Sequence, residues 1–159
     1  MSQVDAYHEA GHAFMAFYVG ARVRSVTIDP DRDEGPERYA DTQVEWPLKR
    51  FPPRQLRERM VQVALAGPVA EMIHSGENPH PGFVAEWSSD WKVAWDAAAP
   101  LVPDERLRIG YLERVVRQVY QILNRDDHWQ ALAAIVDHLD AHETIEGDEV
   151  LEIMRTWLE

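Results

Sequence analysis

The residues best suited to chemistry in this 159-residue chain are His8-Glu9-Ala10-Gly11-His12. Two histidines four positions apart lie on one face of an α-helix, so both imidazoles can bind one metal ion. The H-E-x-x-H pattern is typical of zinc-dependent hydrolysis of peptides. His8 and His12 would hold the zinc, and Glu9 would take a proton from a water molecule as general base. The alternative is a chance match, because histidines at this spacing also occur on solvated helix faces.

The residues around this motif favour the helix that it needs. Ser2 and Asp5 have the spacing of a capping box, residues 3–19 contain no proline, and Gly20 is suited to end the helix. Gly11 costs about 1 kcal/mol relative to alanine inside a helix, which indicates that another segment packs closely against it. We therefore expect an apolar helix over 3–19, and this expectation weakens the chance-match alternative.

The rest of the chain predicts a mainly α (α+β) fold with a small β-sheet near the N-terminus. Alternating apolar residues predict strands over 22–29 and 39–46, with a charged loop over 29–38 between them. Pro68 interrupts a helical pattern over 55–75, so a kink or two abutting helices are expected there. Further helices are predicted over 85–99, 103–124 and 149–158. Between the last two, Asp127 can cap another helix, in which Leu132, Ile135, Val136 and Leu139 are expected to be buried.

Composition limits the classes of function. Hydrophobic residues make up 45% of the chain, so residues 1–159 are expected to form one domain. The net charge of -12 argues against nucleic acid and anionic membrane surfaces as partners. Because there is no cysteine, His, Asp and Glu must supply every metal ligand. No apolar stretch is long enough for a membrane segment and residues 1–5 do not resemble a signal peptide, so a cytoplasmic location is expected.

A catalytic zinc site usually needs a third protein ligand, and the sequence offers several candidates. Asp90 lies early in a predicted helix, where an aspartate can equally be a helix cap or a solvated acid. His74 and His80 flank a proline-rich loop and could be ligands or polar surface. His138 and His142 repeat the i,i+4 spacing, but the acids around them indicate a solvated helix face, so no second metal site is expected there.

Three tryptophans recur every four residues beside Asp90. Trp87, Trp91 and Trp95 would share one helix face. Such a stripe is most often part of the core. The alternative is a partly exposed aromatic wall, extended by Trp46, that binds apolar substrate side chains or a partner subunit.

Taken together, these segments resemble the protease domain of the FtsH-type zinc metalloproteases, the peptidase M41 family. Residues 6–13, Ala-Tyr-His-Glu-Ala-Gly-His-Ala, are similar to the active-site helix of that family, and residues 26–28 to the strand after it. Residues 65–71 resemble a family helix with a Gly-Arg-x-Ala-Glu-Glu pattern. Residues 88–91 fall on a Ser-Asn-Asp-Leu-like segment, and 143–150 resemble an acidic segment before the terminal helix. The resemblance covers nearly the whole chain.

The resemblance implies a helical zincin-type metalloprotease domain with Zn²⁺ as cofactor. It implies that His8, His12 and Asp90 are the metal ligands and that Glu9 is the catalytic base. Asp90 follows His12 by 78 positions, close to the spacing in the family. Glu71 falls on a recurrent family acid, for which a structural or ligand-supporting role and an ordinary helix-surface carboxylate are both open.

The chain also departs from the family pattern. Pro68 stands where the family has arginine, Met72 replaces its second acid, and Ser89 and Trp91 replace Asn and Leu. No phosphate-binding loop sequence is present. A stand-alone protease domain is therefore expected, with homo-oligomerisation or a separate ATPase partner left open.

The expected function is zinc-dependent hydrolysis of peptide bonds in flexible or unfolded polypeptides. A strand over 22–29 at the sheet edge would pair with the extended substrate. The alternative is a catalytically silent metal- or peptide-binding module that acts as an adaptor or assembly part. The intact Glu9 argues against that alternative, because a purely structural metal site needs no base.

Overall fold

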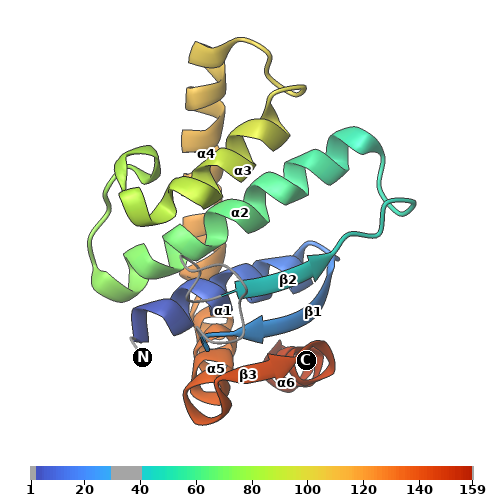
Figure 1. Cartoon of the computed structure of the whole chain (residues 1–159), viewed down its shortest axis with the longest axis vertical. Helices are drawn as coiled ribbons and strands as arrows, with labels where there is room; N and C mark the ends of the chain where they lie inside the picture. Colours follow the sequence, from blue (N-terminus) through green and yellow to red (C-terminus); the bar gives the residue numbers. More distant parts are fainter. Residues whose placement is uncertain (1–2, 30–40, 159) are drawn as a thin grey trace.

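A computed structural model describes residues 3–29 and 41–158 as a mainly helical fold with one small antiparallel sheet (Figure 1). The helices are α1 (Gln3–Tyr18), α2 (Pro53–Ser75), α3 (Ser88–Ala98), α4 (Glu105–Leu123), α5 (Asp126–His142) and α6 (Gly147–Leu158). The strands are β1 (Arg22–Thr27), β2 (Asp41–Glu45) and β3 (Thr144–Glu146). Two short 3₁₀ turns, η2 (Pro81–Phe83) and η3 (Ala85–Trp87), come before α3 in the chain. The mainly α class and the small sheet are thus confirmed.

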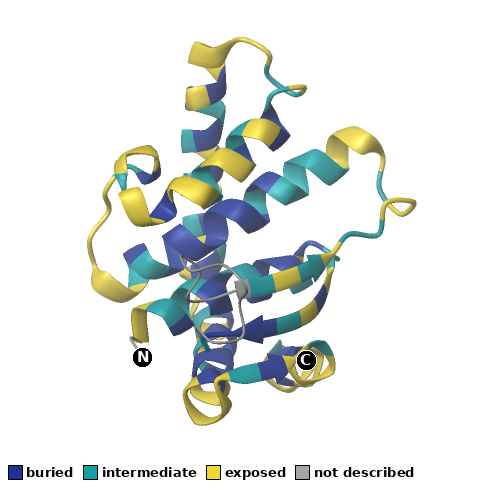
Figure 2. Cartoon of the chain, in the orientation of Figure 1, coloured by how far each residue is buried: buried dark blue, intermediate teal, exposed yellow. Residues whose placement is uncertain are grey.

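Helix α1 lies in the middle of the fold. It packs between α2, α5 and the sheet, and buried residues run along α1, α5 and the middle of α2 (Figure 2). The close packing expected at Gly11 is present. A Cβ atom at Gly11 would lie 2.5 Å from the Ala66 carbonyl oxygen and 2.7 Å from the Ala70 Cβ. Gly11 therefore lets α1 and α2 approach each other closely along the segment that carries the histidine pair.

Helix α2 is one continuous helix that includes Pro68, so of the two outcomes expected there, two abutting helices are wrong and the kink stays a prediction. Pro68 lies in the buried middle of α2, beside Gly67. A proline there removes one backbone hydrogen bond. The packing of this buried segment against α1 offsets that loss and keeps the two halves of the helix together.

The sheet corrects the expected role of the strand over 22–29. The strand order is β2-β1-β3 with both pairs antiparallel, so β1 is the central strand and not an edge. The physical reason is β3, a three-residue strand too short to be predicted, in which Ile145 pairs with Val26. In the described part of the sheet, β2 is the edge strand on the side of α2. Nearly all of the predicted loop over 29–38 lies outside the described residues.

Two expected helix caps have different outcomes. Asp127 is not the cap of α5, because the helix begins at Asp126. The Asp127 carboxylate accepts from the His128 backbone N–H and pairs with Arg125. The predicted capping box at the start of α1 includes Ser2, which lies outside the described residues.

Across 3–29 and 41–158, no helix combines the length and the apolar character needed to cross a bilayer.

Candidate metal centre

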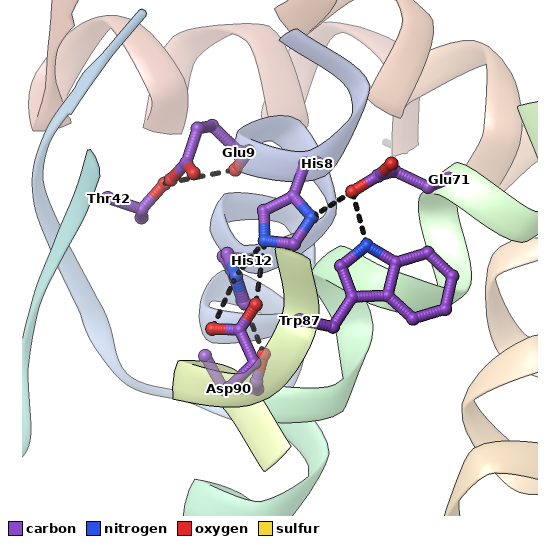
Figure 3. Close-up of polar contacts among 8 residues, drawn as sticks. His8, Glu9, His12, Thr42, Glu71, Trp87 and Asp90 are labelled. Atoms are coloured by element: carbon purple, nitrogen blue, oxygen red, sulfur yellow. Dashed lines mark hydrogen bonds and ion pairs between the residues drawn. The ribbon is translucent and has the colours of Figure 1, made fainter. Parts of the chain in front are cut away.

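The structure brings together the three residues expected as metal ligands (Figure 3). His8 Nε2 lies 3.1 Å from His12 Nε2 and 2.7 Å from Asp90 Oδ2, and His12 Nε2 lies 3.4 Å from Asp90 Oδ1. Ligand atoms in a tetrahedral zinc site, at about 2.0–2.1 Å from the metal, lie about 3.3 Å from one another. The spacing of these three groups is close enough for them to hold a single metal ion.

The other ring nitrogen of each histidine has its own acceptor. His8 Nδ1 lies 2.5 Å from Glu71 Oε2, and His12 Nδ1 lies 2.7 Å from the carbonyl oxygen of Val63. A proton on Nδ1 can be donated to these oxygens, which leaves Nε2 to face the cluster with a free lone pair. Such outer hydrogen bonds fix the tautomer and the orientation of metal-binding histidines.

The carboxylate of Glu71 is shared between His8 and Trp87. Trp87 Nε1 donates a hydrogen bond to Glu71 Oε2 at 2.7 Å, and Trp87 is only 5% exposed. Glu71 therefore contacts a candidate ligand directly and is not an ordinary helix-surface carboxylate. The contact also links the start of α3, which carries Asp90, to the environment of His8.

Gly67 of α2 provides the space in which the two imidazoles meet. A Cβ atom at Gly67 would lie 2.4 Å from His12 Nε2 and 2.7 Å from His8 Nε2. From the sequence alone, Gly67-Pro68 is read equally well as a helix interruption, so this glycine is not identified as a neighbour of the cluster. Any larger residue at position 67 would clash with the two imidazoles.

Glu9 lies beside the cluster and is not part of it. The side chain is buried, and Thr42 of β2 donates a hydrogen bond to Glu9 Oε1 at 2.6 Å. Burial raises the pKa of the Glu9 carboxyl, against the opposing influence of His12 and His8. Thr42 was not recognised from the sequence, since a threonine inside a strand carries no signal for a contact with a distant helix. Glu9 and Thr42 lie on one side of the histidines, and Glu71 and Trp87 on the other (Figure 3).

The electrostatics of the cluster favour a bound cation. Burial disfavours a charge on each group, but the interactions within the cluster are stronger. His12 and His8 hold the pKa of Asp90 well below its usual range. The hydrogen bonds with Asp90 and Glu71 raise the pKa of His8 to about 10. A metal ion at this site would have to displace the proton of His8, because imidazoles that bind a metal are neutral.

The remaining histidine candidates have other partners. His74 stacks on Tyr7 with ring centroids 4.0 Å apart, and His80 Nε2 pairs with Glu113 at 3.0 Å. His138 bonds to a carbonyl of its own helix. Within residues 3–29 and 41–158, no other group of three potential ligands is close enough to hold a metal ion.

The tryptophan stripe belongs mainly to the core, as expected. Trp87 is buried, and Trp91 and Trp95 are half-buried against the core. The guanidinium of Arg108 lies 4.5 Å from the ring centroid of Trp95. Trp46, by contrast, lines a cleft of about 870 Å³ that opens over the cluster between α1, β2, α2 and α3.

In comparisons with known proteins, no family model matches this chain and no curated protein is significantly similar to it. Function is therefore inferred from the geometry of the cluster and from the motifs that resemble the FtsH-type proteases.

Proposed function

We propose that this chain is a zinc-dependent endopeptidase domain of the FtsH type. His8, His12 and Asp90 hold the zinc, and Glu9 is the general base. One observation carries the proposal. Asp90, 78 positions after His12, comes within ligand distance of both histidines, while Glu9 lies beside them and outside the ligand set.

The donor set suits zinc. Two imidazoles and one carboxylate are typical ligands of catalytic zinc, and three protein ligands leave the fourth position to water or substrate. Bound zinc would supply a Lewis acid that polarises the scissile carbonyl and acidifies a water molecule. Glu71 and the Val63 carbonyl orient the imidazoles, and Gly67 leaves room for them.

Glu9 is placed to move the proton. Thr42 donates to Oε1 of Glu9, so Oε2 is the oxygen left to accept a proton from the attacking water. Burial raises the pKa of this carboxyl, which makes it a stronger base than an exposed glutamate. Glu9 then delivers that proton to the nitrogen of the leaving amine. Thr42 fixes the carboxylate during both transfers.

The cleft supports an extended polypeptide as substrate. Thr42, Val44 and Trp46 alternate along β2 and its C-terminal end, and their side chains line the cleft. An edge strand has backbone N–H and C=O groups that can pair with an added strand. A folded target keeps its own backbone groups paired, so flexible tails and unfolded chains are the expected substrates.

Exchange of Glu9 for glutamine tests the chemistry separately from metal binding. Glu9→Gln keeps zinc, because residue 9 is not a ligand, but loses hydrolysis by several orders of magnitude. Zinc is measured by elemental analysis, and activity by cleavage of a casein-like unfolded protein. Glu77→Gln, in an exposed loop outside the cleft, is the matched control and retains both properties. Cleavage by Glu9→Gln at the wild-type rate would rule out this mechanism.

The second candidate is a metal- or peptide-binding adaptor without catalysis. A buried carboxylate that is not a ligand costs stability, and an adaptor has no use for it. The burial of Glu9 therefore favours the peptidase. Wild-type protein that binds zinc stoichiometrically but cuts no unfolded substrate would favour the adaptor instead.

A further inference from the structure

The two ends of the cleft can be distinguished from the directions of its helices. His8 of α1 contacts Glu71, and His12, one turn later, contacts Val63, so α1 and α2 are antiparallel. The N-terminal end of α1 therefore lies beside the C-terminal half of α2, and its later turns lie beside the earlier turns of α2.

Helix α3 runs in the same direction as α1. Trp87 at its start contacts Glu71, whereas Arg57, near the start of α2, donates to the carbonyl of Ala97 near the end of α3. The starts of α1 and α3 thus meet the C-terminal half of α2 at one end of the cleft. The later turns of both helices lie at the other end, with the candidate metal cluster between the two ends.

One end of the cleft is acidic. Asp5 of α1, Glu71 of α2 and Glu86 of η3 line the cleft there. Burial raises the pKa of Asp5, and the charge of Glu71 adds to that rise. Among the described residues that line the cleft there is no lysine or arginine. A bound divalent ion would neutralise the two negative charges of Glu9 and Asp90. The charges at the acidic end would remain, so this end stays negative with the metal in place.

The other end of the cleft is apolar. Val93 of α3 is 50% exposed and Trp46 is half-buried, so both offer accessible apolar surface. Met60 of α2 and Val44 of β2 complete this surface. Thr42 contacts Glu9 in the middle of the cleft, and Val44 and Trp46 follow it along the chain away from the acidic end.

We propose that this cleft selects polypeptides with basic residues on one side of the cleaved bond and apolar residues on the other. Asp5 and Glu86 are the residues that select the basic side. This inference rests on the proposed peptidase function and names the substrate class of that same site.

The distances define where the basic residue should lie. Asp5 precedes His8 by three residues, about 4.5 Å along a helix axis. One residue of an extended peptide spans about 3.3 Å. A lysine or arginine one to three positions from the cleaved bond can therefore reach Asp5 or Glu86.

Two peptides of identical composition and reversed order test the proposal. One has a pair of lysines before a central cleavable segment and leucines after it, and the other has the reverse order. We expect wild type to favour one order by about three- to tenfold in kcat/KM, as exposed charge pairs allow. The double variant Asp5→Asn, Glu86→Gln should reduce this preference to within about twofold. Raising the salt concentration should also weaken it.

A matched control separates the local charges from the net charge of the chain. Glu77→Gln combined with Glu152→Gln removes two exposed acids outside the cleft and should keep the wild-type preference. Equal cleavage of both peptides by wild type would overturn the proposal. A preference that persists in the Asp5→Asn, Glu86→Gln variant would overturn it as well.

Binding distinguishes a failure of this inference from a failure of the peptidase function. The same peptides carrying a fluorophore are titrated with Glu9→Gln protein and followed by anisotropy. If the Glu9→Gln protein binds one peptide more tightly than the other and wild type cuts neither, the peptidase is refuted and the polarised cleft is supported. Cleavage without discrimination in either assay would refute the polarised cleft alone. If the peptides are neither bound nor cut, both proposals are wrong.

Discussion

Two histidine pairs with the same spacing have different surroundings in this protein. His8 and His12 of α1 turn their Nε2 atoms toward each other at 3.1 Å, with the Asp90 carboxylate beside both. The rings of His138 and His142 on α5 lie 6.4 Å apart between centroids, and both residues are exposed. His138 Nδ1 bonds to a carbonyl of its own helix at 2.9 Å.

The contrast shows that the i,i+4 spacing supplies two ligands but does not by itself make a site. Around the first pair, α2 supplies an acceptor for each Nδ1 and a glycine that leaves space, and α3 supplies the third ligand. In the described part of the chain, no third potential ligand lies close enough to the second pair to complete a metal site. A metal site here depends on what packs against the histidine-bearing helix.

The largest expected effect comes from removing one member of each pair. His8→Ala should abolish stoichiometric zinc binding, because two ligands remain where three are needed. His138→Ala, the matched control, should leave zinc binding unchanged. Elemental analysis after dialysis and titration with a zinc-sensitive dye measure both. Loss of zinc in His138→Ala, with retention in His8→Ala, would reverse the assignment of the two pairs.

The next effect concerns the space between the imidazoles. Gly67→Ala puts a methyl group against both rings, which Val63 and Glu71 hold in place, so zinc affinity should fall by at least about tenfold. Gly110→Ala is the matched change in α4, where a Cβ atom meets open space. This control should bind zinc normally and gain about 0.5–1 kcal/mol of stability from helix propensity. Zinc titration and thermal unfolding followed by circular dichroism check the pair. Normal zinc affinity in Gly67→Ala would show that the rings can move aside.

The smallest of the three effects comes from the hydrogen bond between Trp87 and Glu71, the acid that contacts His8. Trp87→Phe keeps a buried ring but removes the N–H that donates to Glu71, so zinc affinity should fall by about tenfold. Trp95→Phe, in the helix α3 that follows Trp87, changes a ring that lies against Arg108 and should change zinc affinity little. Trp87→Phe should add nothing in a Glu71→Gln background if the tryptophan acts through Glu71. Equal zinc affinities in wild type, Trp87→Phe, Glu71→Gln and the double variant would mean that this contact has no influence on the metal.

The sequence predicted those parts of the site that depend on local spacing. The helix over 3–19 and the alignment of His8 with His12 follow from helical geometry, and α1 differs from the prediction by one residue at its end. Asp90 is different. Chemistry alone favoured a cap or a solvated acid, and the resemblance to the FtsH-type proteases was needed to nominate it. Its position against the histidines depends on how α2 and α3 pack, which no local pattern encodes.

Other features escaped prediction for the same physical reason. Thr42 and Trp87 contact Glu9 and Glu71 across long stretches of sequence, and their residue types alone do not identify these partners. Strand β3 has three residues, too few for a period of two to be visible. Because β3 is not visible in the sequence, the pattern predicts that the strand over 22–29 lies at the edge of the sheet. Pro68 signals a break by its local chemistry, but the burial of α2 overrides that signal.

The pairing of β1 with β3 has a consequence for the nascent chain. Thr27 and Thr144 hydrogen-bond at 2.7 Å although 117 positions separate them, and Gly147 packs directly against the backbone of Val23. On the ribosome, α1, α2 and α3 emerge well before β3. The three ligands can therefore gather while one side of β1 still lacks its partner. An unpaired strand edge invites pairing with other chains. We therefore expect the interval between synthesis of α3 and of β3 to be the time when the growing polypeptide depends most on chaperones.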